Sequence, residues 1–399
     1  MNVCITGIGC VSGIGLNVEE HLVSFRNGQN GLGAVTLFPT RHAMPVAEVK
    51  RTNDALKQYL GIPVSVELSR TALLGMTAAF EALADSGLDL SDPADKLRIG
   101  LISSTSTGGM DSTESFYPSF HKNPAHGRLR YVVSHDAGDS TERIAFFLGI
   151  TGFRTTVSTA CSSAANALML GARMIRQGML DVVIAGGTDA LCKFTLNGFA
   201  SLMILDKNPC RPFDESRAGL NLGEGAGYLV LQSEATVAKT PYCLLSGYAN
   251  ANDAFHQTAS SSEGTGAYLA MKGALDKAGL EPEEVGYINA HGTGTPNNDA
   301  SESQAIRRLF GNRIPPLSST KTFTGHTLGA AGALEAVFSV LSLKQGILYP
   351  NLNFSTPIKE TGLIPVTRYQ EGISLRSVLS NSFGFGGNNA SLLFRKLKG

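Results

Sequence analysis

Two stretches of this chain repeat the same order of local patterns, and the repetition limits the folds open to it. In each stretch an apolar helix ends at a Gly-Leu step, a short apolar strand follows, and a turn rich in threonine and glycine comes next. The first copy spans residues 69–109 and the second spans residues 274–295. A chain built twice on one αβ plan is expected to pack its two copies as a single body.

A second pair of similar segments supports the duplication. Residues 164–177 and 331–343 are apolar almost all round, and each run follows a stretch rich in serine and threonine. A helix without a polar face has to be covered on every side, so we expect both helices to lie between two sheets. The alternation of strands and helices favours largely parallel sheets. The predicted fold is a duplicated α/β/α/β/α block with pseudo-twofold halves at residues 1–238 and 239–399.

The overall composition excludes several classes of protein. Lys+Arg and Asp+Glu balance at 33 each, so no global charge attracts nucleic acid. There is no basic leader and no apolar run of transmembrane length, which predicts a cytoplasmic protein without a membrane span. Six scattered cysteines show neither disulfide nor zinc spacing. Gly7 and Gly9 lack the acidic residue that a dinucleotide site requires about 20 positions later.

Cys161 is the first candidate for chemistry. It follows a polar approach and directly precedes the apolar run that starts at Ala164. At a helix N-terminus, free N–H groups and the helix dipole favour negative charge, so the thiol is expected to lose its proton more easily and to become a better nucleophile. The alternative is a buried structural cysteine.

Two histidines lie in glycine- and threonine-rich turns of the second half. His291 ends a predicted strand, on the side where α/β proteins place ligands, and His326 precedes the second apolar helix. Either histidine taken singly is more often structural. If the halves are related by pseudo-twofold symmetry, however, Cys161 and the His326 region converge near the axis. A metal site is not expected, because the histidines are 35 positions apart and no third donor accompanies them.

Two further features surround these residues. Glu335 falls inside the second apolar helix, where a charge is costly unless it is paired, and Lys321 is its expected partner. This pair either is structural or raises the positive potential near the histidines. Near the C-terminus, Phe383 and Phe385 alternate with glycines between two apolar strands. This segment is either a tight hairpin or a place where backbone and ring approach a ligand.

Together these motifs resemble the β-ketoacyl-acyl-carrier-protein synthases, specifically the elongating condensing enzymes with a Cys-His-His site. The resemblance extends over nearly the whole chain. It rests on four motifs in the family's order: Ala160-Cys-Ser, His291-Gly-Thr-Gly-Thr, Lys321-(x)4-His326 and the final Gly-Phe-Gly-Gly. It implies the thiolase-like duplicated α/β/α/β/α fold and a dimer.

The resemblance also implies a role for each matching residue. Cys161 is expected to be the nucleophile, His291 and His326 to stabilise the enolate, and Lys321 and Glu335 to order the site as a pair. The N–H groups of Cys161 and Phe385 are expected to form the oxyanion hole, and Phe385 is also the expected gate. The positions expected to bind substrate are Thr293, Thr295, Phe383 and Thr107. No cofactor is expected on the enzyme, because phosphopantetheine arrives on the acyl carrier protein. The implied reaction is decarboxylative Claisen condensation of malonyl-carrier protein with an acyl chain on Cys161, in type II fatty-acid, polyketide or aryl-polyene synthesis.

Two other functions are weighed against this one. A non-catalytic, chain-length-determining subunit of a ketosynthase heterodimer usually lacks the nucleophile. A Cys-His hydrolase would leave Lys321 and the glycine-flanked Phe385 unexplained. The resemblance does not decide between a homodimer and a heterodimer with a chain-length-factor-like partner.

The chain departs from the family pattern at several positions. Residue 388 is Asn where Thr is usual, Ala164 replaces a common Gly, and Thr107 is small where a bulky aliphatic residue is common in fatty-acid enzymes. The basic run that often docks the carrier protein is missing, since residues 63–70 hold one cation. Arg211 remains the candidate for carrier-protein docking.

Overall fold

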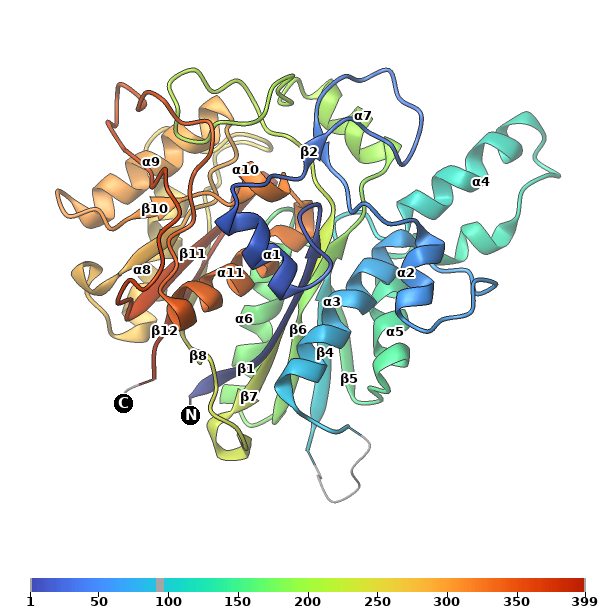
Figure 1. Cartoon of the computed structure of the whole chain (residues 1–399), viewed down its shortest axis with the longest axis horizontal. Helices are drawn as coiled ribbons and strands as arrows, with labels where there is room; N and C mark the ends of the chain where they lie inside the picture. The colour runs from blue at the N-terminus through green and yellow to red at the C-terminus, as the bar shows by residue number, and fades with distance from the viewer. Residues whose placement is uncertain (1, 91–96, 398–399) are drawn as a thin grey trace.

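Ten strands join in one mixed sheet in the computed structural model, which describes residues 2–90 and 97–397 (Figure 1). The strands are β1 (Val3–Ser12), β2 (Leu32–Gly33), β3 (Val46–Ala47), β4 (Ile99–Ser104), β5 (Phe153–Val157), β6 (Val182–Asp189), β7 (Gly225–Ser233), β8 (Cys243–Asn252), β9 (Tyr287–Asn289), β10 (Leu317–Ser318), β11 (Ser377–Gly384) and β12 (Asn388–Arg395). β2 and β3 form a separate two-stranded sheet.

The helices alternate with these strands along the chain. The α-helices are α1 (Val18–Arg26), α2 (Asn53–Tyr59), α3 (Arg70–Ser86), α4 (Met110–Lys122), α5 (Ala137–Leu148), α6 (Ser163–Arg176), α7 (Lys193–Ser201), α8 (Thr265–Ala278), α9 (Pro296–Phe310), α10 (Lys321–Thr324) and α11 (Ala331–Gln345). Short 3-10 turns are η1 (Leu129–Tyr131), η2 (Val133–His135), η3 (Glu234–Thr236), η4 (Pro282–Glu284), η5 (Leu328–Ala330) and η6 (Phe385–Gly387).

The order of the strands shows the duplication. The sheet runs β10-β9-β11-β12-β8-β1-β7-β6-β4-β5, and its two halves meet where β1 pairs with β8 through two residue pairs. Each half has parallel strands at its outer edge and antiparallel strands toward the middle. The predicted duplicated layered fold is therefore confirmed.

The expectation of largely parallel sheets is wrong. Of the nine strand pairs that make up the large sheet, β10–β9, β9–β11, β4–β5 and β4–β6 are parallel and the other five are antiparallel. The alternation of elements does not reveal where the chain turns straight back. β12 follows β11 after only residues 385–387, and so short a connection permits antiparallel pairing alone.

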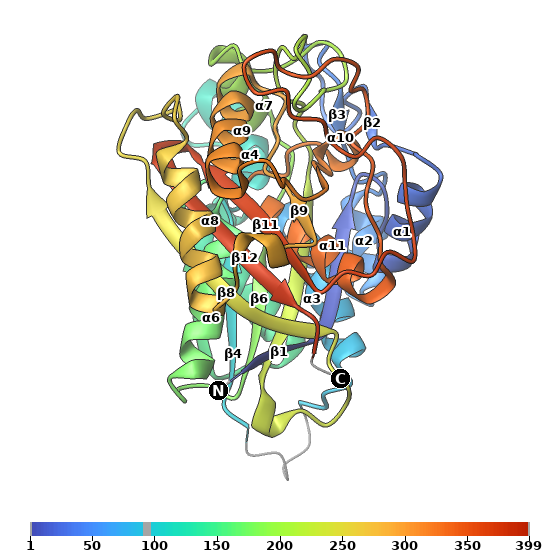
Figure 2. The ribbon, with the colours of Figure 1, turned by 90° about the vertical axis from the view of Figure 1, so that its left-hand side faces the viewer.

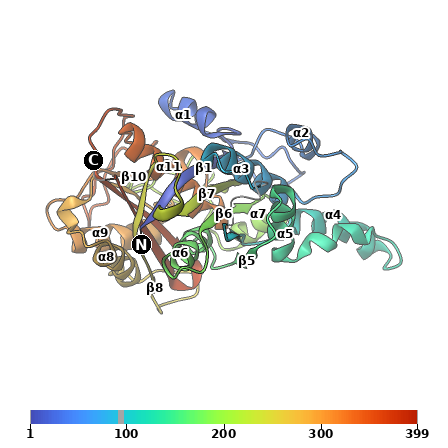
Figure 3. The same ribbon diagram turned by 90° about the horizontal axis from the view of Figure 1, so that it is seen from below.

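The two apolar helices lie in the middle of the molecule. α6 packs on β6 and β12, α11 packs on β7 and β11, and the helices also contact each other. Residues 331–343 of α11 are buried without interruption. α8 and α9 lie toward one end of the molecule and α4 and α5 toward the other (Figure 3). Both apolar helices are therefore covered on every side, as predicted, but they lie between the two halves of one large sheet and not between two separate sheets.

The outer helices explain the repeated Gly-Leu step. α3 covers β1, β6 and β7, while α8 covers β8 and β12 (Figure 2). Both helices end at a glycine in the left-handed region, Gly87 at φ 73° and Gly279 at φ 63°. Glycine adopts this conformation at little cost, and the leucine that follows it packs back on the apolar core. The repeat therefore marks the point where each outer helix turns back toward the sheet.

Two observations concern the described residues as a whole. No helix among them has both the length and the apolar character needed to span a membrane. All six cysteines are buried and unpaired.

The crossing of α6 and α11 generates a stability prediction. A Cβ added at Gly332 would lie 2.9 Å from the backbone nitrogen of Ala165 and 2.8 Å from the hydroxyl of Ser382. Gly332→Ala should therefore push the helices apart and lower the free energy of unfolding by roughly 1–3 kcal/mol, the usual cost of overpacking. Denaturant unfolding monitored by circular dichroism checks this. Gly33→Ala, where a Cβ meets no atom within 4 Å, is the control, and equal stability of the two variants would contradict the prediction.

Candidate active site

Cys161 lies in a strained turn between β5 and α6. Ala160 has φ 55°, a left-handed value that is uncommon for a residue with a side chain, and Ser162 is the N-cap of α6. Such strain persists only where the surroundings impose it, and it clusters at functional sites. Here it presents the Cys161 side chain to the interior, where the residue is 5% exposed.

Two cavities meet at the Cys161 side chain. One has a volume of about 210 Å³, and the site residues along it are Cys161, His291, Thr293, Thr295, His326, Phe383 and Phe385. The other has a volume of about 460 Å³, and among its lining residues are Thr107, Cys161, Phe194, Phe199, Leu202, Leu328 and Phe385. The structure thus brings together a residue of the first half and residues of the second half that are far apart in sequence.

Phe385 separates the two cavities. Its backbone N–H donates a hydrogen bond to the Cys161 thiol, and its ring stacks on Phe199 of α7 with ring centroids 6.0 Å apart and planes at 20°. Both rings line both cavities. Sequence reasoning missed Phe199, because a single aromatic residue in a short helix carries no distinctive pattern.

The two histidines face each other beside the thiol. Their ring centroids are 5.4 Å apart in an edge-to-face arrangement, and His291 also contacts the ring of Phe383 at 5.7 Å. The backbone N–H of His291 donates to Glu302 at 2.9 Å, and that of His326 donates to the carbonyl of Asn221 at 2.7 Å. Each histidine is therefore fixed by its backbone as well as by its packing.

The hydrogen bonds of the rings assign their tautomers. Lys321 Nζ lies 3.2 Å from Nδ1 of His291, and the backbone N–H of Leu328 donates to Nδ1 of His326 at 3.2 Å. Both Nδ1 atoms are therefore acceptors, which leaves the proton of each neutral ring on Nε2. Burial, followed by the charge of Lys321, holds the pKa of both histidines well below the usual 6.5. Both rings are neutral N–H donors at physiological pH.

Lys321 and Glu335 form a buried ion pair. Lys321 Nζ contacts Glu335 Oε1 and donates to the carbonyl of His291 at 2.6 Å. Burial raises the pKa of Glu335 to about 7, although the charge of Lys321 acts in the opposite direction. The pair is a buried structural ion pair, and it also places a positive charge next to both imidazoles. The two alternatives of the sequence analysis are therefore compatible with each other.

The expectation that Cys161 has an easily lost proton is wrong for the resting protein. Burial raises the pKa of Cys161 to about 12, while the charge of Lys321 and the N–H of Phe385 act to lower it. Desolvation of a thiolate in an almost closed site outweighs these nearby favourable groups. The resting residue is therefore a thiol.

Buried carboxylates that sequence reasoning missed hold the loops of the site. Glu302 accepts from the N–H groups of His291 and Gly292, and Asp299 accepts from those of Thr293 and Gly294. These two acids lie three residues apart on α9, so they share a face of the helix. Two acidic residues at this spacing, directly after the turn that carries His291, are the sequence feature that could have indicated their role in holding the turn.

A third carboxylate joins the two halves. Asp189, at the end of β6, accepts from the backbone of Ser106 at 2.9 Å and from that of Gly329 at 2.7 Å. It also accepts from the N–H of Thr107 at 3.3 Å, which places Thr107 on the wall of the larger of the two cavities. The turn after His326 is thereby fixed to the first half.

Arg211 is not among the residues that line either cavity. Its Nη1 donates to Ser216 at 3.2 Å, and its backbone lies beside Gly294 of the histidine turn. Its predicted role in docking remains a prediction.

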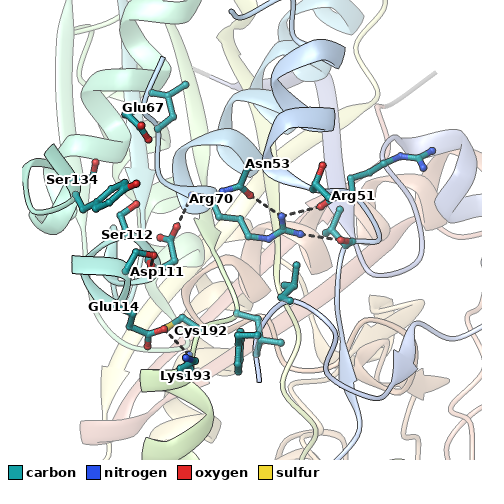
Figure 4. A pocket seen from close by; sticks show the side chains of 18 of the residues that line it. Arg51, Asn53, Glu67, Arg70, Asp111, Ser112, Glu114, Ser134, Cys192 and Lys193 are labelled. Atoms are coloured by element: carbon teal, nitrogen blue, oxygen red, sulfur yellow. Dashed lines mark hydrogen bonds between the residues drawn. The ribbon is translucent and has the colours of Figure 1, made fainter. Parts of the chain in front are cut away.

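A third cavity, with a volume of about 800 Å³, does not contain the predicted site. Several of the charged residues that line it are engaged with neighbouring groups, as Figure 4 shows for Arg70 and Asp111. Arg70 pairs with buried Glu224 at 2.7 Å, and Glu114 accepts from the first N–H groups of α7. The single cation of residues 63–70 is thus buried and is not available to a docking protein.

Comparisons with known proteins agree with this geometry. Residues 1–236 match the family model described as the N-terminal domain of beta-ketoacyl synthase, and residues 242–355 match that of its C-terminal domain. The chain belongs to the beta-ketoacyl synthase family. It is 36% identical to 3-oxoacyl-[acyl-carrier-protein] synthase 2 of Staphylococcus aureus (strain N315), with 99% of this chain and 98% of the relative covered.

Solved structures give the same result for the fold. The ishigamide ketosynthase/chain length factor superposes with a TM-score of 0.93 at 31% identity, covering 100% of this chain and 99% of the other. A chain of the solved complex of the ketosynthase ApeO with its chain length factor ApeC, from Xenorhabdus doucetiae, gives a TM-score of 0.85 at 33% identity, covering 99% of this chain and 98% of that chain.

The placement of Lys321 generates a prediction about the histidines. Lys321→Met removes the charge that lowers the pKa of both rings, so the pKa of His291 and of His326 should rise toward 6.5. Histidine-selective NMR titration measures both midpoints. Lys359→Met, at an exposed lysine, is the control. Unchanged midpoints in Lys321→Met would show that the charge does not reach the rings.

Proposed function

We propose that this protein catalyses decarboxylative Claisen condensation, extending an acyl chain held on Cys161 with a unit from malonyl-acyl-carrier protein. The observation that carries the proposal is the meeting of one thiol and two neutral histidine N–H donors at the junction of two cavities. One cavity suits the acyl chain, and the other suits the arm that delivers each thioester. The setting is type II fatty-acid, polyketide or aryl-polyene synthesis.

The first half-reaction transfers the acyl chain to Cys161. The sulfur attacks the carbonyl of the acyl-carrier thioester, a new carbon–sulfur bond forms, and the carrier sulfur departs with the proton that the cysteine loses. The N–H groups of Cys161 and Phe385 support the developing oxyanion, since Phe385 already donates to the sulfur. Because the resting thiol is protonated, this loss of the proton belongs to the acylation step and does not precede it.

The second half-reaction uses the histidines. The malonyl thioester carbonyl accepts from Nε2–H of His291 and His326, carbon dioxide leaves, and the resulting enolate attacks the acyl group on Cys161. A carbon–carbon bond forms, and the bond to the Cys161 sulfur breaks, leaving a thiolate that takes a proton from solvent to return to the resting thiol. Removing one preorganised donor of this kind usually costs about 10²–10³ in rate. Neutral rings suit this role because they donate without giving up a proton to the enolate.

The enzyme needs no cofactor of its own in this proposal. Phosphopantetheine would arrive on the acyl carrier protein and occupy the cavity of about 210 Å³, where the hydroxyls of Thr293 and Thr295 lie 2.8 Å apart. Arg211, beside this turn, remains the candidate for docking the carrier protein.

The alternative of a non-catalytic chain-length subunit has less support. One cavity of this chain is lined by Cys161, His291 and His326, and the two histidine rings contact each other. Lys321 contacts the ring of His291. A subunit that only shapes a pocket has no need of that arrangement.

We also propose that the protein works as a dimer. β5 is the last strand of the sheet, and so it has a neighbour on one side only. Large apolar side chains are exposed nearby, with Phe146 of α5 89% exposed and Phe153 of β5 41% exposed. α4 projects from the body, and the segment after it exposes Leu129 and Val133 (Figure 1). An unpaired edge with apolar surroundings suits a second chain, either a copy of this one or a chain-length-factor-like subunit.

Sedimentation equilibrium tests the dimer. The purified chain should sediment as two copies of 42.0 kDa, and Phe153→Asp should shift it toward one copy because it buries a charge at the proposed interface. Ile364→Asp, at an exposed site in the other half, should leave the mass unchanged. A monomer that pairs only with a co-expressed chain-length-factor-like subunit would favour the heterodimer, and a chain that stays monomeric in both cases would exclude the proposal.

Substitution of the nucleophile tests the reaction. Cys161→Ala should abolish condensation because no acyl-enzyme can form. Cys161→Gln should still decarboxylate malonyl-carrier protein, since the histidine donors remain. Mass spectrometry of the carrier protein measures both outcomes, and Cys4→Ala, a buried cysteine in β1, should retain activity. Full condensing activity in Cys161→Ala would end the proposal.

A further inference from the structure

Asn388 is the centre of a cluster of polar side chains behind the nucleophile. Its Oδ1 accepts from the hydroxyl of Ser162 at 2.7 Å, from Nδ2 of Asn166 at 2.9 Å and from Nδ2 of Asn250 at 2.7 Å. Asn250 also donates to Asn166 at 2.9 Å. One amide oxygen thus joins the N-cap and first turn of α6 to strands β8 and β12.

The cluster joins the two chain segments that carry the proposed oxyanion hole. Ser162 directly follows Cys161, and Asn388 ends the short loop that starts at Phe385. Gly384, the last residue of β11 before this loop, lies close to the nucleophile turn, since an added Cβ would lie 2.9 Å from the carbonyl oxygen of Thr159 and 3.2 Å from the backbone nitrogen of Cys161. The contact at Gly384 limits how closely the loop approaches the nucleophile turn. The hydrogen bond between Ser162 and Asn388 fixes the position of the loop along that turn.

The loop itself needs such a restraint. Gly386 and Gly387 have φ of 79° and 76°, and glycines place few limits on the backbone between Phe385 and Asn388. On the other side Asn252 donates to the carbonyl of Gly386 at 3.0 Å. The N–H of Gly386 also donates to the carbonyl of Gln257 at 2.7 Å, so these bonds hold the side of the loop that faces away from Ser162. The bond from Ser162 to Asn388 holds the loop to the nucleophile turn itself.

We infer that Asn388 is a positioning residue for acyl transfer, holding the loop of residues 385–387 against the nucleophile turn so that the N–H groups of Phe385 and Cys161 converge on one oxygen. The inference rests on the proposed function and goes beyond it, because it assigns a role in the transfer of the acyl group onto and off Cys161 and none in decarboxylation. The histidine donors are fixed by other contacts, to Glu302, Asn221 and Lys321. Decarboxylation should therefore not depend on Asn388.

The experiment measures the two half-reactions separately. Acylation of Cys161 by octanoyl-acyl-carrier protein is followed by mass spectrometry of the intact enzyme. Decarboxylation of malonyl-carrier protein is followed in a Cys161→Gln background. Asn388→Ala should slow acylation roughly tenfold to a hundredfold, less than the 10²–10³ expected for complete loss of one donor, and should change decarboxylation by less than about twofold. Asn312→Ala, at an exposed asparagine, is the matched control.

A double-mutant cycle links the effect to the hydrogen bond. If Ser162 and Asn388 act through their shared contact, Ser162→Ala adds little to the loss of acylation in Asn388→Ala. Equal losses in acylation and decarboxylation, or additive effects in the cycle, would mean a general structural role and would overturn the inference alone. Failure of the unmodified enzyme to form an acyl-enzyme would instead overturn the proposed function, and the inference with it.

Discussion

The packing of α6 against α11 between the two halves of the sheet is the constraint on which the site depends. Each helix begins beside one part of the chemistry, α6 after Cys161 and α11 after the turn that carries His326. The pseudo-twofold arrangement brings these two beginnings together, and Gly332 allows the start of α11 to approach the backbone of Ala165 in α6 closely. Asp189, at the end of β6, also binds the turn before α11 through the N–H of Gly329. Neither half alone carries both the nucleophile and the histidines, so the site exists only where the two halves meet.

Burial does two opposite things to the titratable groups of the site. It keeps both histidines neutral, which makes them suitable hydrogen-bond donors, and it keeps Cys161 protonated, which makes the free thiol a poor nucleophile. The charge of Lys321 moves both kinds of group in the useful direction, since it disfavours imidazolium and favours thiolate. The buried charge of Lys321 therefore serves both proposed half-reactions. Its ion pair with Glu335 offsets the cost of burying that charge.

Structural features that produce a recognisable sequence pattern could be predicted from the sequence. Helices without a polar face, the Gly-Leu steps and the turns around Cys161, His291 and His326 predicted the layered duplication and the convergence of residues from both halves. Strand direction was not predictable, because alternating elements look the same whether a strand continues or returns. The pKa of Cys161 was also misjudged, since a helix N-terminus can be read from sequence while the depth of burial cannot. Phe199, Glu302 and Asn388 matter only through neighbours that the fold supplies.

The burial of the Cys161 thiol behind the strained turn at Ala160 also affects how fast peroxides can oxidise it. Peroxides react with thiolates, and sulfenic acid forms fastest on cysteines that are ionised and open to solvent. A side chain that is 5% exposed and protonated at rest offers neither property. The same seclusion that obliges the sulfur to lose its proton during acyl transfer thus shields it from oxidants between turnovers.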